Sequence, residues 1–141
     1  MNPKLYLFLL RVAMGWLMLY AGLTKVIDSS WSAAGYLNAA KTFPAFYHWL
    51  AQPGLLPLIN FINEWGLVLL GVSLILGIRV RITGIAGALL MLLYYFPVLE
   101  FPRIPPGHAY LIDEHIIYAL ALLYFAAGDA GKAWWGFDQR A

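Results

Sequence analysis

Glu64 is the residue of this chain whose chemistry is hardest to explain by packing alone. The fourteen residues from Trp65 to Ile78 carry no charge, and a helix needs about 20 apolar residues to cross a bilayer. The span must therefore reach back to about Leu56, which puts Glu64 at membrane depth. An ionisable side chain there is costly, so it should face the protein interior and serve a function. We expect Glu64 to exchange protons with a bound ligand.

A second group of ionisable residues, Asp113-Glu114-His115, precedes another uncharged run. Ile116 to Gly128 supplies only thirteen residues, so the same length argument draws the three side chains into the outer third of the membrane. Histidine is the side chain that most readily takes up and releases protons near neutral pH. His115 is therefore the second candidate catalytic residue.

These groups are predicted to lie in one layer. Glu64 is fifteen residues from Arg79, and Glu114 is fifteen residues from Asp129. At about 1.5 Å per residue, each carboxylate stands roughly 22 Å above the cytoplasmic edge. Lys25, at the outer end of the first span, reaches a similar level. The candidate substrate-binding residues at or above this layer are Lys25, Trp31, Asn60, Asp113 and Glu114.

Two interpretations of this layer stay open. In the first, it is a polar pocket that opens outward under a roof of aromatic residues and binds a quinone or a small polar substrate. In the second, it is an ion-pair network that fixes how the helices pack. Lys25 is expected to reach a carboxylate of another helix, Glu64 or Asp113, because an unpaired buried charge is costly. Arg11 is expected to extend toward the membrane surface.

The composition favours a membrane protein. Of 141 residues, 62% are hydrophobic and 11% are charged, whereas soluble domains carry about 25% charged residues. The net charge of +2 is too small to indicate a nucleic-acid partner. There is no cysteine, which excludes disulfides and thiolate ligands. Metal binding is not expected, because the three histidines lack the spacings of metal-binding motifs.

The chain is predicted to be a single all-α membrane domain over residues 1–141, a four-helix bundle embedded in a lipid bilayer. The spans cover about residues 5–26, 56–78, 82–99 and 109–128, and prolines from Pro97 onward are expected to break the third helix. Residues 28–55, between the first two spans, are rich in aromatic side chains. They are expected to form a cap at the membrane interface, in which Ser32 to Thr42 fits one amphipathic helix.

Basic residues predict the orientation, because they concentrate in the cytoplasmic loops of membrane proteins. Four spans put one set on the same side and another set on the opposite side. The first set is Lys4, Arg79, Arg81, Lys132 and Arg140, and the second is Lys41 and Arg103. Both termini are therefore expected to be cytoplasmic in a multi-pass protein of the cell membrane, with the cap outside.

Several short motifs resemble those of the DoxX/DoxD family of small four-helix membrane proteins. They are Arg11-x3-Gly15, Ala21-Gly22-x2-Lys25, Glu64 ahead of Gly71, Gly77-x-Arg79, and a closing Gly128-Asp129-Ala130-Gly131 followed by Phe137-Asp138. DoxD is similar to this chain in its long tryptophan-containing first connection. It is the membrane subunit of a thiosulfate:quinone oxidoreductase and works with a second subunit, DoxA. The resemblance implies quinone-linked oxidoreduction, with no DoxA-like domain in this chain.

The expected function is that of a membrane subunit of a quinone-linked oxidoreductase, with the quinone near Glu64. The alternative is a non-catalytic accessory subunit of a larger respiratory or photosynthetic complex. In that case the small-residue patch of the third span, Gly84, Gly87 and Ala88, is the natural contact face for other subunits. A small-solute transporter is a third reading, for which no inverted repeat is evident.

Overall fold

The computed structural model describes residues 2–99, 111–128 and 130. Every regular element in this part of the chain is helical, so the predicted all-α fold is confirmed. The helices along the bundle are α1 (Pro3–Ile27), α4 (Leu56–Phe61), α5 (Leu67–Leu76), α6 (Val80–Val98) and α7 (Glu114–Ala127). A π-helical turn, η1 (Ile62–Gly66), joins α4 to α5. The cap contains α2 (Ala34–Asn38) and α3 (Pro44–Leu50).

Three helical stretches of the described chain are long and apolar enough to cross a membrane. They are Pro3–Ile27, Leu56–Leu76 and Val80–Val98. The helix α7 has 14 residues, about 21 Å at 1.5 Å per residue, and is too short to cross the bilayer core alone. It begins at Glu114, later than the predicted start near residue 109, because Asp113 caps its first turn by accepting hydrogen bonds from the N–H groups of His115 and Ile116.

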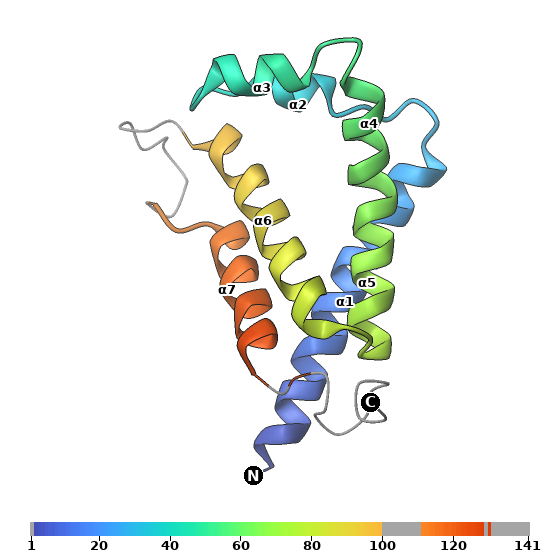
Figure 1. Ribbon diagram of the computed structural model, residues 1–141, viewed down its shortest axis with the longest axis vertical. Helices are drawn as coiled ribbons and strands as arrows, with labels where there is room; N and C mark the ends of the chain where they lie inside the picture. Colours follow the sequence, from blue (N-terminus) through green and yellow to red (C-terminus); the bar gives the residue numbers. More distant parts are fainter. Residues whose placement is uncertain (1, 100–110, 129, 131–141) are drawn as a thin grey trace.

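The bundle consists of two closely packed helix pairs, α1 with α5 and α6 with α7. The pairs meet at the end away from the cap and diverge toward it, as Figure 1 shows. Gly71 explains why α1 and α5 pack so closely, since a Cβ at this position would lie 2.4 Å from the backbone nitrogen of Leu19. Small residues of this kind let helix backbones approach in membranes. The sequence motif around Gly71 therefore serves packing.

The small-residue patch of α6 is used inside the chain. Gly84, Gly87 and Ala88 are buried, and a Cβ on Gly84 would lie 2.4 Å from the carbonyl oxygen of Leu122 in α7. The prediction that this patch is a contact face for other subunits is therefore wrong. The small residues do allow another helix to approach α6 closely, as the prediction assumed. That helix is α7 of the same chain.

Arg11 is fully buried, with 0% of its surface exposed. Its Nη1 donates a hydrogen bond of 3.0 Å to the carbonyl oxygen of Ala130, and its guanidinium lies 5.5 Å from the ring centroid of Phe8. The prediction that Arg11 extends to the membrane surface is therefore wrong. Ala130, just beyond the end of α7, lies against the guanidinium of Arg11 in α1, and this contact can be seen only once the two segments are placed together.

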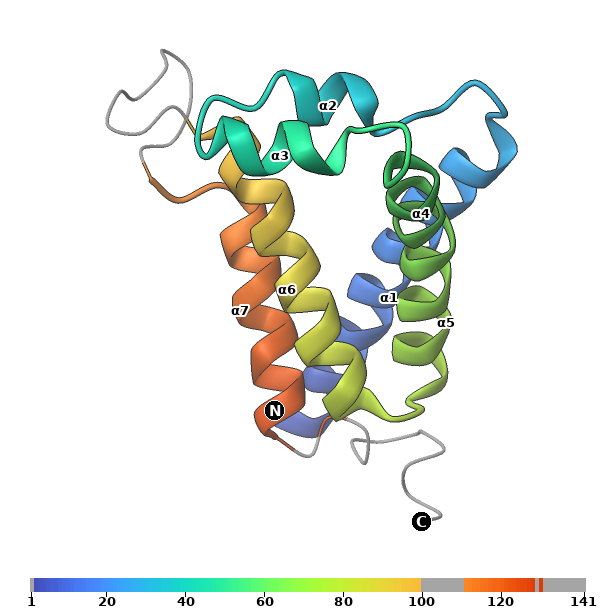
Figure 2. The ribbon, with the colours of Figure 1, turned by 45° about the horizontal axis from the view of Figure 1, so that its top comes forward.

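The cap has two short helices. The helix predicted for Ser32 to Thr42 is present but shorter, as α2, and α3 follows beyond that range. The chain breaks after α2, and Phe43 adopts the left-handed conformation (φ 53°) ahead of Pro44, the first residue of α3. The two helices lie across the cap end of the bundle in Figure 2. They share a small core in which Leu37 and Tyr47 are buried and Trp31 and Phe96 pack alongside. The predicted aromatic-rich cap is therefore present.

Hydrogen bonds tie the cap to the end of α6. Pro97 lies inside this helix and has no N–H, so the carbonyl of Leu93 loses its helical donor. The hydroxyl of Tyr47 replaces it, donating to the Leu93 oxygen at 3.0 Å. Tyr36 donates to the carbonyl of Tyr94, and Thr42 donates to the carbonyl of Leu99. The helix ends at Val98, one residue after Pro97, which confirms the predicted end of this span near residue 99. The tyrosine satisfies the carbonyl that Pro97 frees within the last turn.

Some predictions concern residues outside the described part of the chain. Residues 100–110, with Glu100, Arg103 and His108, are expected to form a rigid proline-rich loop, and Trp134-Trp135 are expected to anchor an interfacial tail. The rest of these residues are Asp129, Phe137 and Asp138 of the closing motif and the basic residues Lys132 and Arg140.

Candidate functional site

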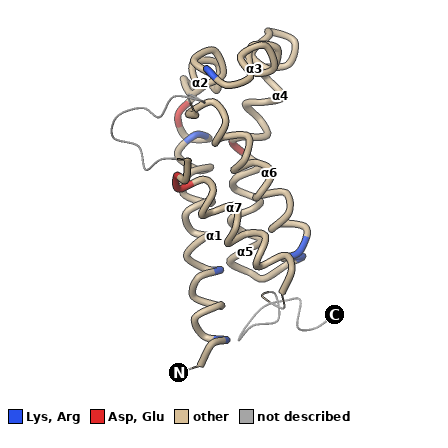
Figure 3. The backbone as a smooth tube through the Cα atoms, turned by 90° about the vertical axis from the view of Figure 1, so that its left-hand side faces the viewer, with Lys and Arg blue, Asp and Glu red and all other residues tan. Residues whose placement is uncertain are grey.

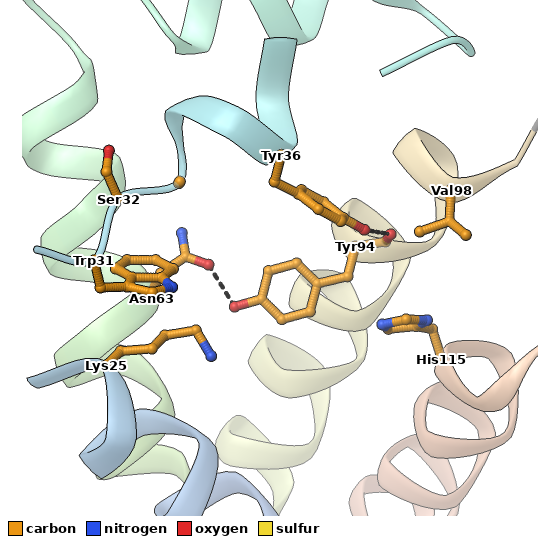
Figure 4. A pocket seen from close by; sticks show the side chains of 9 residues that line it. Lys25, Trp31, Ser32, Tyr36, Asn63, Tyr94, Val98 and His115 are labelled. Atoms are coloured by element: carbon orange, nitrogen blue, oxygen red, sulfur yellow. Dashed lines mark hydrogen bonds between the residues drawn. The ribbon is translucent and has the colours of Figure 1, made fainter. Parts of the chain in front are cut away.

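Two adjoining cavities lie between the helix pairs, beneath the cap. The upper cavity, of about 280 Å³, is lined by cap and bundle residues, among them Trp31, Tyr36 and Asn63. The lower cavity, of about 360 Å³, extends into the bundle between α1, α5, α6 and α7. Lys25, Tyr94 and His115 line both cavities, and Figure 4 shows them converging from three helices. The two cavities therefore meet at these three side chains.

Lys25 supplies the positive charge of the site. Its ammonium donates a hydrogen bond of 3.0 Å to the carbonyl of Ala21, one turn back in α1, and lies 5.4 Å from the ring centroid of Trp31. Such a cation–π contact stabilises the charge. None of the carboxylates that the structure describes lies within ion-pair distance of this ammonium, so the predicted pairing with Glu64 or Asp113 is wrong. An aromatic face takes the place of the counter-charge.

Asp113 and His115 form a carboxylate–imidazole pair. Asp113 Oδ2 lies 2.7 Å from His115 Nδ1, and the two side chains are 24% and 21% exposed. An ionised carboxylate only accepts hydrogen bonds, so this contact places the imidazole proton on Nδ1. Nε2 is then the ring nitrogen left to face the cavities that His115 lines. Figure 4 shows the ring extending from α7 toward Tyr94.

Tyr94 and Asn63 connect the two helix pairs, and the sequence singled out neither. The hydroxyl of Tyr94 donates to Asn63 Oδ1, and the amide of Asn63 donates to the carbonyl of Ile59 at 2.7 Å. The rings of Tyr94 and His115 meet edge to face with their centroids 6.0 Å apart. The sequence spacing could have indicated that Asn63 faces inward. Asn63 lies four residues before Leu67 and eight before Gly71, and therefore on the face of the helix that packs inward.

Glu64 lines neither of these two cavities. It is half-buried, and no described residue forms a hydrogen bond or ion pair with its carboxylate. Its neighbour Asn63 lines the upper cavity. Successive residues of a helix point about 100° apart. Asn63 lies on the same face as Leu67 and Gly71 and therefore points inward, whereas Glu64 points in a different direction.

The remaining predicted site residues divide between the cavities and the cap. Trp31 lines the upper cavity, and Glu114 lines the lower one from an exposed position at the start of α7. Asn60 lies in neither lining. Its Oδ1 accepts a 3.0 Å hydrogen bond from the N–H of Ala33, which fixes the start of the cap on α4. Asn60 therefore holds the roof of the site in place.

Tyr36 gives the upper cavity a hydroxyl that stays protonated. Burial, together with the charges of Tyr47 and Asp113, raises the pKa of Tyr36 above its usual range. The phenol therefore remains neutral and keeps donating to the Tyr94 carbonyl. No three of the His, Asp and Glu side chains that the structure describes come together as metal ligands.

The arrangement can hold a polar group and exchange a proton with it. Lys25 donates hydrogen bonds, the face of Trp31 can stack on a flat ring, and His115 can act as a base or, once protonated, as an acid. The lower cavity adds apolar walls from Met18, Leu67 and Met91.

The family of the chain can now be stated. Residues 6–99 match the family model of DoxX, which is two thirds of the chain. The chain belongs to the DoxX family. Searches of curated proteins and of solved structures gave no significant match. The DoxX match runs from α1 through the cap to the end of α6, so it includes Lys25, Asn63 and Tyr94 and leaves out Asp113 and His115.

Membership confirms the resemblance to DoxX drawn from the sequence motifs. It agrees with the apolar helices in describing an integral membrane protein whose surface contacts lipid. The motif residues Arg11 and Gly71 pack the helices, and the Gly77-x-Arg79 motif forms the tight turn before α6, with φ of 66° and 46° at its two ends. Of the motif residues, Lys25 lines both cavities and Ala21 lines the lower one.

Proposed function

We propose that this DoxX protein is a membrane subunit of a quinone-linked oxidoreductase and binds the quinone headgroup beneath the cap. One observation carries the proposal: Lys25, Tyr94 and His115 come from three different helices and meet where two cavities join. A scaffold has no need of such a convergence around open space. The family membership is compatible with this function, and the similarity to DoxD favours it.

The side chains fit a quinone. Its two carbonyl oxygens accept hydrogen bonds. The Lys25 ammonium carries three N–H donors and, among the described residues, donates to the carbonyl of Ala21. Trp31 offers an aromatic face next to this ammonium, on which a flat ring stacks. The Tyr94 hydroxyl already donates to Asn63, so toward a ligand it is an acceptor, which suits a quinol hydroxyl.

The bound quinone would supply the redox chemistry, and the protein would manage the protons. Asp113 holds the His115 ring through Nδ1, and Nε2 can accept a proton from a quinol or, when protonated, give one to a quinone. The carboxylate stabilises the imidazolium that forms in between. Glu114 lines the lower cavity from an exposed position and is suited to pass the proton onward. We assign electron transfer to a partner redox subunit.

We propose that the protein lies in the cell membrane with both ends in the cytoplasm and the cap outside. Lys4 at the start of α1, and Arg79 and Arg81 at the turn between α5 and α6, lie at the end opposite the cap (Figure 3). Basic residues concentrate on the cytoplasmic side. The site would then open toward the outer half of the bilayer.

The accessory-subunit alternative rests on a different surface from the one expected. The small residues of α6 are covered by α7, but the outer face of α1 presents Trp16 and Tyr20, each 62% exposed. This face is available to a neighbouring subunit or to lipid. Contact with a partner redox subunit through it is compatible with quinone binding, so we favour the quinone function.

The test is a binding titration of the purified protein in lipid nanodiscs with a short-tailed ubiquinone, followed by quenching of tryptophan fluorescence. Lys25→Met and His115→Phe should each weaken binding about tenfold, the loss of one charge-assisted contact of about 1.4 kcal/mol. Glu64→Gln is the matched control, because Glu64 lies at the same depth but lines neither cavity. If Lys25→Met and His115→Phe bound the quinone as tightly as the control Glu64→Gln does, the proposal would be overturned.

A further inference from the structure

The lower cavity is bounded by two tight helix seams, and the two helix pairs that these seams form pack only loosely on each other. α1 packs closely on α5 and α7 on α6, with glycines at both contacts. In the described chain, α1 and α7 make few close backbone contacts with each other. Both Figures 1 and 2 show α1 leaning away from α7 toward the cap. The seam between α1 and α7 is thus a loose side of the cavity.

The exposure of the lining side chains points to the same side. Met18, Leu67 and Met91 form the inner wall and are 1%, 1% and 4% exposed. Leu17 on α1 is 38% exposed and Glu114 on α7 is exposed, although both line the same cavity. Tyr118, one turn further along α7 from the cap, lines it too and is half-buried. A lining residue that is also exposed must stand at the mouth. The mouth of the lower cavity therefore runs along the seam between α1 and α7, and Leu17 and Tyr118 lie on its two sides at the end away from the cap.

The cavity changes character along the helices. At its cap end stand Lys25, Glu114 and His115, and further from the cap its walls are apolar. Leu17 lies two helical turns below Lys25 on α1, in a segment apolar enough to cross a membrane. A mouth at this level opens into the bilayer core, since the outward faces of both helices are rich in exposed apolar side chains.

We propose that the site takes a lipid-soluble quinone with a long isoprenoid tail, which enters sideways from the bilayer between α1 and α7. The headgroup rests at Lys25, Tyr94 and His115, and the tail leaves between Leu17 and Tyr118. The inference rests on the proposed quinone function and adds the class of quinone and its route. The continuity between the polar end and the apolar mouth selects this occupant, because one molecule with a polar head and an apolar tail matches both.

The route can be closed with a cross-link. The chain has no cysteine, so Leu17→Cys with Tyr118→Cys introduces the sole thiol pair, which a bifunctional thiosulfonate reagent bridges and a reductant releases. The protein is reconstituted in vesicles containing radiolabelled ten-isoprenoid ubiquinone, and exchange with unlabelled quinone is followed. Bridging should slow exchange at least about tenfold, a barrier higher by about 1.4 kcal/mol, and reduction should restore it. Tail-less ubiquinone should exchange at an unchanged rate through the cap side.

A variant with a larger side chain at the mouth provides a second measurement that does not depend on cross-linking. Leu17→Trp should narrow the mouth and slow exchange of the long-tailed quinone. Leu120→Trp, on the outward face of α7 where Leu120 is 62% exposed, is the matched control and should leave exchange unchanged. Unchanged exchange of the long-tailed quinone in both the bridged protein and Leu17→Trp would overturn the lateral route while leaving quinone binding intact. A protein that binds neither quinone before bridging would overturn the proposed function and this inference with it.

Discussion

The hydroxyl of Tyr47 donates a 3.0 Å hydrogen bond to the carbonyl oxygen of Leu93, which Pro97 leaves without its helical donor. Tyr47 is 2% exposed and belongs to the cap, whereas Leu93 belongs to a membrane-spanning helix. Tyr47 thus replaces the backbone hydrogen bond that Pro97 removes, and the same contact holds the cap over the cavities.

Removing this hydroxyl should destabilise the protein. Tyr47→Phe leaves the Leu93 carbonyl unsatisfied, which costs about 1–3 kcal/mol. The cost should shrink in a Pro97→Ala background, because alanine restores the N–H that the carbonyl needs. Thermal melts in detergent of both single variants and the double variant measure this coupling. Tyr124→Phe, at a 61% exposed position of α7, is the control. Equal costs in both backgrounds would contradict the assignment.

The cap tyrosines predict a loss of stability at high pH. Burial raises the pKa of Tyr47 and, with the charges of Tyr47 and Asp113, that of Tyr36 above the ordinary value of 10.0. The folded protein therefore holds these phenolic protons more tightly than the unfolded chain does. Their contribution is complete below about pH 10 and is lost as the pH rises further. Melts from about pH 8 to about pH 11 should show this fall. The loss of thermal stability with rising pH should be shallower in Tyr36→Phe. An unchanged slope in this variant would contradict the role assigned to Tyr36.

Asp113 has two roles that substitutions can separate. Asparagine caps helices about as well as aspartate, so Asp113→Asn should keep stability within about 0.5 kcal/mol, whereas Asp113→Ala should lose about 1 kcal/mol. Both variants remove the charge that holds His115. Both should therefore reduce proton uptake coupled to quinone reduction, measured with a pH-sensitive dye in vesicles. Wild-type proton uptake by Asp113→Asn would show that the carboxylate only caps α7.

Lys25 and Glu64 should behave independently. The described structure has no ion pair between them, so Glu64→Gln should change stability by no more than about 0.5 kcal/mol. The effects of Lys25→Met and Glu64→Gln on thermal stability should add in the double variant. A Glu64→Gln protein that melts far below wild type and is rescued by Lys25→Met would instead establish a buried ion pair.

The proposed orientation can be tested with single cysteines, since the chain has none of its own. Gln52, exposed in the turn after α3, and Lys4, near the start of α1, lie at opposite ends of the bundle. A membrane-impermeant maleimide added to intact cells should label Gln52→Cys and should label Lys4→Cys only after lysis. The reverse pattern would place the cap in the cytoplasm.

The sequence by itself determined the helical architecture and the level of the site. Uncharged runs reveal spanning helices because charges are costly in lipid, and the length argument for Glu64 predicted a start at about Leu56, where α4 begins. The same reasoning brought Lys25 and His115 to one layer, where the structure places them around the cavities. These inferences depend on composition and distance along the chain, which the sequence states directly.

The tertiary structure alone decided which side chains of that layer face inward. In a membrane helix the lipid-facing and protein-facing sides are both apolar, so hydropathy gives no periodicity to tell Tyr94 in α6 from its neighbours. Asn63 and Glu64 are adjacent in sequence, and the packing of α5 on α1 turned Asn63 inward. The burial of Arg11 required contact with Ala130, 119 residues away. Such choices depend on which helices meet, and that is a property of the assembled bundle.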